Sequence, residues 1–176
     1  MDWQFLFADM FELRAFDSLW YWLLMGLSWA VVMQRALGVP WDLVQRGRQS
    51  GAEGAAELDG LVHLFAHRAL DLTDQGAIVM MAMACFFGSG LAVAGLGYGS
   101  ELAQALLLWG GGLALIVPLN IMTARQIIDQ DLRGAALWAV LSRHRLVMHV
   151  IAVAAVFLAG VFSVLQSPAF AWPLVP

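Results

Sequence analysis

Residues 75–124 read QGAIVMMAMACFFGSGLAVAGLGYGSELAQALLLWGGGLALIVPLNIMTA, a stretch whose only formal charge is Glu101. It divides into two apolar runs, residues 77–97 and residues 102–122. At about 1.5 Å of rise per residue, a helix of either length spans the roughly 30 Å hydrocarbon layer of a membrane. Glycines at the join permit a chain reversal, and Ser100 stands where it can cap the second helix. The stretch therefore predicts a membrane hairpin.

The composition of the whole chain agrees with a membrane protein. Hydrophobic residues make up 61% of the 176 positions and charged residues only 12%, far from the proportions of soluble domains. All nine basic residues are arginine, which excludes a Schiff-base enzyme because that chemistry needs a lysine. The single cysteine, Cys85, excludes an intrachain disulfide and a multi-cysteine metal or iron–sulfur site.

Two further apolar segments, residues 18–37 and residues 146–165, predict one span on each side of the hairpin. Residues 1–17 and 58–74 carry apolar side chains on one helical face, which predicts amphipathic helices at the membrane interface. Residues 44–56 are expected to form a solvated connector with the least order. The predicted fold is therefore all-α, an integral membrane four-helix protein with interfacial amphipathic helices, in a single membrane domain over residues 1–176.

The segment at residues 58–74 has a clear helical period. The apolar positions of its stripe are Leu58, Leu61, Val62, Phe65, Ala69 and Leu72. No proline separates this segment from the run at residues 77–97, so one long helix through the intervening Gly76 is expected.

The arginines predict the orientation. Eight of the nine lie in the segments between spans one and two and between spans three and four: Arg35, Arg46, Arg48, Arg68, Arg125, Arg133, Arg143 and Arg145. Because loops rich in arginine stay in the cytoplasm, both termini are expected to be periplasmic in a bacterial inner membrane, and residues 58–74 cytoplasmic.

Small residues on the first helix of the hairpin predict a helix-packing surface. Gly88, Ala92 and Gly95 share one face, and Gly90 and Ala94 lie on an adjacent one. Such faces let helix backbones approach closely in a bilayer.

The third span, residues 102–122, has its own irregular features. Trp109 is followed by three glycines and then by Pro118. This pattern predicts a span that bends or packs closely.

Three histidines are candidate ligands. His63 and His67 are one helical turn apart, with Asp71 one turn further, which allows a metal site or, as we favour, the solvated face of an amphipathic helix. A zinc protease motif is excluded because Leu64 stands where that motif has glutamate. His149 lies near one end of the last span, where it suits either a pigment or haem ligand or, as we favour, a hydrogen bond between helices or a contact with a headgroup. We therefore expect no metal and no cofactor.

Two stretches carry a resemblance, residues 38–46 (GVPWDLVQR) after the first span and Arg143-His144-Arg145 before the last. They resemble a bacterial family of small membrane proteins labelled "component of SufBCD complex". That label implies iron–sulfur cluster assembly, which is cytosolic, whereas this chain has no cysteine set for a cluster. No functional residue is carried over from the family.

Two classes of function fit the sequence. The first is a non-catalytic accessory or scaffold subunit of a larger bacterial membrane complex, respiratory or photosynthetic. The alternative is a homo-oligomeric channel or transporter-like protein, in which several copies line one path. An enzyme is not expected because no nucleophile is paired with a base. The expected partners are membrane lipids and other membrane subunits or further copies of the chain, and no nucleic acid.

Overall fold

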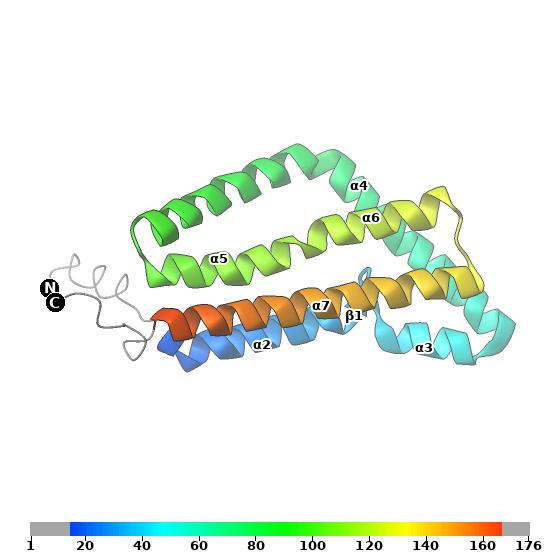
Figure 1. The fold of residues 1–176 in the computed structure, drawn as a ribbon. Helices are drawn as coiled ribbons and strands as arrows, with labels where there is room; N and C mark the ends of the chain where they lie inside the picture. Colours follow the sequence, from blue (N-terminus) through cyan, green and yellow to red (C-terminus); the bar gives the residue numbers. More distant parts are fainter. Residues whose placement is uncertain (1–14, 167–176) are drawn as a thin grey trace, which may run out of the picture.

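The computed structural model describes residues 15–166, except for the side chains of Ala52 and Gln75. Helices make up almost all of this part of the chain (Figure 1). The elements in chain order are η1 (Ala15–Asp17), α2 (Leu19–Met33), β1 (Arg35–Ala36), β2 (Val39–Pro40), α3 (Trp41–Gln49), α4 (Gly51–Ala92), η2 (Val93–Gly97), α5 (Glu101–Ala114), α6 (Ile116–Asp129) and α7 (Gly134–Gln166). Most of the expected interfacial helix at residues 1–17 lies outside the described residues.

Three helical stretches are long and apolar enough to cross a membrane: Gly76–Gly97, Glu101–Asp129 and Gly134–Gln166. They contain the expected spans at residues 77–97, 102–122 and 146–165, so the all-α class and a membrane location hold. The first expected span corresponds to α2, which has 15 residues. At about 1.5 Å per residue, α2 is roughly 22 Å long, shorter than the hydrocarbon layer.

The first span was expected to run from about residue 18 to Met33, with a possible extension to Leu37, and α2 ends at Met33. Beyond it, β1 pairs antiparallel with β2, with Ala36 opposite Val39. The two residues between the strands, Leu37 and Gly38, have φ angles of 52° and 85°. Positive φ at both central positions is the geometry of a tight two-residue hairpin turn, which glycine adopts without strain.

The prediction of a poorly ordered connector at residues 44–56 was wrong. This region contains the end of α3 and the start of α4, and Val44 is fully buried. The two helices cross closely at Gly47, where an added Cβ would lie 2.8 Å from the Cβ of Leu58 and 3.1 Å from the carbonyl oxygen of Gly54. A glycine at the crossing lets α3 fold back on α4 despite the charges on its other face.

The expected continuous helix is confirmed, since α4 runs unbroken for 42 residues through Gly76. Figure 1 shows that it changes direction between its two halves. Its first half buries Leu58, Val62 and Ala66 against α6 and α7, as the predicted stripe requires. Leu72 departs from that stripe because its side chain is exposed.

Two arginines link α3 to α7 through contacts with tryptophan rings. The guanidinium carbon of Arg48 lies 4.0 Å from the ring centre of Trp138, and that of Arg145 lies 4.3 Å from the ring centre of Trp41. Such cation–π contacts are worth about 0.5 to 2 kcal/mol each, depending on how far the pair is desolvated.

A second core joins α2, α5, α6 and α7 along the apolar part of the molecule. Met25 and Trp29 of α2 are almost fully buried there, against Ile116 and the alanines of α7. The indole Nε1 of Trp109 donates a hydrogen bond of 2.9 Å to the hydroxyl of Ser28, which also links α5 to α2.

The third span both bends and packs closely, as its sequence predicted. The helix is interrupted at Leu115, between α5 and α6. Pro118 explains the break, because a proline has no N–H for the carbonyl four residues earlier and its ring crowds that carbonyl. Close packing occurs at Gly112, where an added Cβ would lie 2.9 Å from both the Cβ of Ala155 and the ring of Trp29.

Candidate functional site

The second half of α4 is the most unusual surface of the described structure. We call residues 77–93, with the last of them in η2, the α4 arm. None of these residues is buried, and the most apolar 18-residue window of this span has 0% of its residues buried, against 11% and 22% for the other two spans. Figure 1 shows the arm joined to the other helices at its two ends and separated from them between.

The outer end of the arm is fixed by a group of amide contacts. The side-chain Nε2 of Gln104 donates a hydrogen bond of 2.7 Å to the carbonyl of Gly95, and Gln166 donates to the Oε1 of Gln104. Ser100 caps α5 as predicted, since its hydroxyl accepts from the backbone N–H of Ala103. Gln104 is only 9% exposed, and burial strengthens the hydrogen bonds that it makes.

Among the three glycines of the predicted packing surface, Gly95 is the one that is tightly packed in the described structure. An added Cβ there would lie 2.9 Å from the Cγ of Gln104 and 3.1 Å from its backbone nitrogen. At Gly88 and Gly90, by contrast, nothing lies within 4 Å of an added Cβ. Ala92 and Ala94 are partly buried.

The positions of Gly88 and Gly95 show how the arm leaves the bundle. Gly95 lies in η2, which is a π-helical turn, so the regular α-helical period does not carry its direction back to Gly88. An added Cβ at Gly95 would meet Gln104 of α5, whereas one at Gly88 would meet nothing within 4 Å, and Figure 1 shows α4 and α5 diverging from their common turn. Cys85, which is exposed, and Gly88 and Ala92, which are partly buried, lie close to one helical face of the arm, which we call the small face of the arm.

Large apolar side chains cover the rest of the arm. Phe86 and Phe87 are exposed and contact each other edge to face, with ring centres 5.5 Å apart. The other large exposed side chains are Ile78, Val79, Met80, Met81, Met83 and Val93. Because the arm is apolar on every side, it suits contact with lipid or with another apolar helix.

The two histidine candidates of α4, His63 and His67, have different surroundings. His63 donates through Nδ1 to the carbonyl of Asp59 at 2.8 Å, and its Nε2 lies 3.4 Å from the carboxylate of Asp131. His67 is exposed. Among the described residues, no three His, Cys, Asp or Glu side chains converge as a metal site requires. The structure therefore connects His63 to the α6–α7 loop and not to His67.

Asp131 is the centre of that loop contact. Arg133 binds its carboxylate through Nε and Nη2, at 2.9 to 3.2 Å. The hydrogen bond from Arg133 holds the pKa of Asp131 below its ordinary value, and the charges of Arg133 and His63 act in the same direction. Asp59 meanwhile accepts from the backbone N–H of Gly134 at 3.0 Å and so caps α7.

His149 bonds within its own helix. Its Nδ1 donates to the carbonyl of Arg145, four residues earlier, at 2.7 Å. One ring nitrogen of His149 thus has its hydrogen-bond partner within α7 itself. The bond does not involve Nε2, so the pigment or haem ligand and the contact with another helix or a headgroup both stay predictions.

The sequence analysis missed a buried polar pair between α6 and α7. Thr123 and His144 are both buried, and the hydroxyl oxygen of Thr123 lies 2.9 Å from the Nδ1 of His144. A signal was present, because His144 falls on the helical stripe of Leu137, Leu141 and Met148. The burial of His144 was not predicted because the residues on either side of it, Arg143 and Arg145, are charged.

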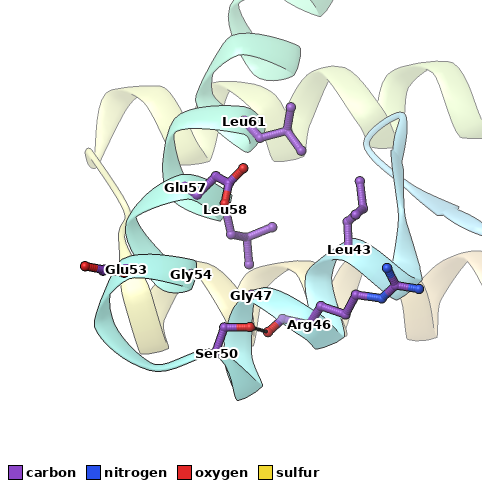
Figure 2. Close-up of a pocket in the computed structure, with 9 residues that line it drawn as sticks. All are labelled: Leu43, Arg46, Gly47, Ser50, Glu53, Gly54, Glu57, Leu58 and Leu61. Atoms are coloured by element: carbon purple, nitrogen blue, oxygen red, sulfur yellow. Dashed lines mark hydrogen bonds between the residues drawn. The ribbon is translucent and has the colours of Figure 1, made fainter.

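The cavity in Figure 2, about 430 Å³, lies between α3 and α4. Its charged residues are Arg46, Glu53 and Glu57, and Glu53 is directed away from Arg46 in this view. The hydroxyl of Ser50 is already bonded to the carbonyl of Arg46 at 2.8 Å. These groups do not form the arrangement of a nucleophile with a neighbouring base that covalent catalysis needs.

Comparison with protein-family models, with curated proteins and with solved structures found no match to this chain. The resemblance stated from residues 38–46 and from Arg143-His144-Arg145 therefore stays a prediction.

Proposed function

We propose that this protein is a non-catalytic accessory or scaffold subunit of a larger bacterial membrane complex, of the respiratory or photosynthetic kind, and that a partner helix packs on the small face of the α4 arm. It would lie in the inner membrane with both termini periplasmic. The observation that carries the proposal is the arm itself, whose apolar 18-residue window contains no buried residue, whereas Gly95 just beyond the arm is buried against α5.

The energetics of helix association in lipid support this use of the arm. Lipid tails are as apolar as leucine side chains, so helices associate through close packing and hydrogen bonds and not through the hydrophobic effect. Cys85, Gly88 and Ala92 allow a partner backbone to come close, because the space over Gly88 is open. Bulkier faces of the arm would keep a partner at a greater distance.

The way the arm is held also favours a binding role. Its outer end is fixed by Gln104 and its inner end continues into the core around Val62. A surface that is already helical and positioned loses little conformational freedom when a partner binds, so more of the contact energy remains as affinity.

The test is to replace Gly88 with leucine and purify the tagged chain from membranes in mild detergent. Nothing within 4 Å would meet a new Cβ at Gly88, so the variant is expected to fold and melt like the parent. A co-purifying subunit should nevertheless be lost, because the side chain fills the space for the partner backbone. The matched control is Gly111→Leu, an equally open glycine on α5, which should retain the subunit.

The alternative of a homo-oligomer has its own readout, because Cys85 is exposed and is the only cysteine of the chain. Mild oxidation of native membranes should leave the chain monomeric on a non-reducing gel if the partner is a different protein. A disulfide-linked dimer of this chain, abolished by Cys85→Ser, would replace the accessory-subunit proposal with self-association through the arm. Equal recovery of the partner with Gly88→Leu and with the control would refute the arm as the binding surface.

A further inference from the structure

A groove of about 590 Å³ lies between α6 and α7. The side chains that line it are Leu119, Met122, Thr123, Gln126, Ala139, Val140, Arg143, His144 and Val147. Arg143 is the only charged residue among them, so the groove presents one positive charge and no carboxylate. Its charge suits an anion.

The groove crosses the level at which the apolar spans end. Leu119, Met122 and Val147 belong to the apolar spans at residues 102–122 and 146–165, whereas Gln126 and Arg143 lie just beyond them. The polar end therefore lies at headgroup level and the apolar end faces the hydrocarbon. Basic pockets between membrane helices on the arginine-rich side are where anionic lipid headgroups bind.

The floor of the groove includes a buried pair of polar side chains, Thr123 and His144. Thr123 donates its hydroxyl proton to the carbonyl of Leu119 at 2.9 Å, since a carbonyl only accepts. In the neutral imidazole, Nδ1–H of His144 then donates to the same hydroxyl oxygen. The opposite nitrogen, Nε2, has no partner in a side chain that is only 3% exposed.

We propose that the α6–α7 groove binds one anionic glycerophospholipid. Its phosphate contacts Arg143 and Gln126, and one acyl chain lies along Leu119, Met122 and Val147.

A lipid fits this groove better than free phosphate does. With Arg143 as the single cation, an inorganic phosphate would gain one charged contact while the apolar end of the groove stayed uncovered. A phospholipid gains the same contact and also covers the apolar end with its chain, which is already dissolved in the bilayer at this depth. Affinity should therefore depend on both parts of the lipid.

The experiment uses the full chain purified in mild detergent, with phosphatidylglycerol, phosphatidylcholine or inorganic phosphate added separately. Native mass spectrometry should show one phosphatidylglycerol per chain, held more tightly than phosphatidylcholine. Arg143→Gln should weaken that binding about fivefold or more, because one arginine near an anionic headgroup has roughly that effect. Arg125→Gln removes the same charge from an exposed position outside the groove and should leave the binding unchanged.

A second pair of variants tests the groove without changing its charge. Ala139→Leu fills the groove and should reduce lipid binding, whereas Ala136→Leu, exposed on the same helix outside the groove, should not. Melting temperatures of all four variants should stay near that of the parent, since these positions are exposed. Equal binding of the two lipids, equal loss in both arginine variants, or full displacement of the lipid by inorganic phosphate would overturn the proposal.

Discussion

Gly112→Ala should destabilise the protein although alanine is the better helix former. The added methyl would lie 2.9 Å from the Cβ of Ala155 and 2.9 Å from the ring of Trp29, whereas ordinary van der Waals contacts lie at 3.4 to 4 Å. The neighbours would thus have to move by about half an ångström. Neither can do so freely, because Ala155 has no rotatable side chain and Trp29 is only 2% exposed.

The matched variant is Gly111→Ala on the same helix, where nothing lies within 4 Å of the new methyl. Both changes gain the helix propensity of alanine over glycine, about 1 kcal/mol at most. Overpacking of a tight site costs about 1 to 3 kcal/mol, so Gly112→Ala should be less stable than Gly111→Ala by that amount. For a chain of this size the difference corresponds to roughly 2 to 4 °C in Tm per kcal/mol.

The assay is thermal unfolding of both variants in the same detergent, followed by tryptophan fluorescence or circular dichroism. Gly110 is a further open position, and Gly110→Ala should behave like Gly111→Ala. A Gly112→Ala protein that melts at or above the temperature of the other two would refute the close contact between α5, α7 and Trp29.

Three further outcomes are expected. Gly95→Ala should lower the melting temperature, because its methyl would lie 2.9 Å from Gln104, while Gly88→Ala should not; equal melting would contradict the divergence of α4 from α5. The predicted orientation can be tested by labelling single cysteines with a membrane-impermeant thiol reagent in a Cys85→Ala background. A cysteine at position 50 should react only after the cell is opened, whereas one at position 100 should react in intact cells with a permeable outer envelope. The reverse pattern would overturn the predicted orientation. Replacing His63 and His67 together with alanine should leave the metal content unchanged by elemental analysis, and bound metal that is lost in this variant would reveal a site on this face.

Part of the site was accessible from the sequence and part was not. The small residues at Gly88, Ala92 and Gly95 could be recognised because their spacing matches a helical period. Their different surroundings could not, since spacing places all three on one face and says nothing about where α5 diverges from it. The pair of Thr123 and His144 joins residues 21 positions apart, and only the packing of α6 on α7 brings them together.

The sequence by itself determined the elements that depend on local chemistry. The hairpin follows from apolar runs long enough for the hydrocarbon layer, the cap at Ser100 from one hydroxyl, and the break before Pro118 from a missing N–H. The continuity of α4 through Gly76 follows from the absence of a proline. Each of these effects acts within a few residues and needs no partner element.

The tertiary structure alone decided which helices pack together. An apolar helix in lipid has no polar side to mark its outer face, and burying leucine against another helix gains little over leaving it in lipid. The choice of neighbour therefore depends on shape, as where Gly112 receives Trp29 and Gly95 receives Gln104. Such fits are made by residues far apart in the chain, which is why the burial of Trp29 in the bundle and the separation of the α4 arm from it became visible only in three dimensions.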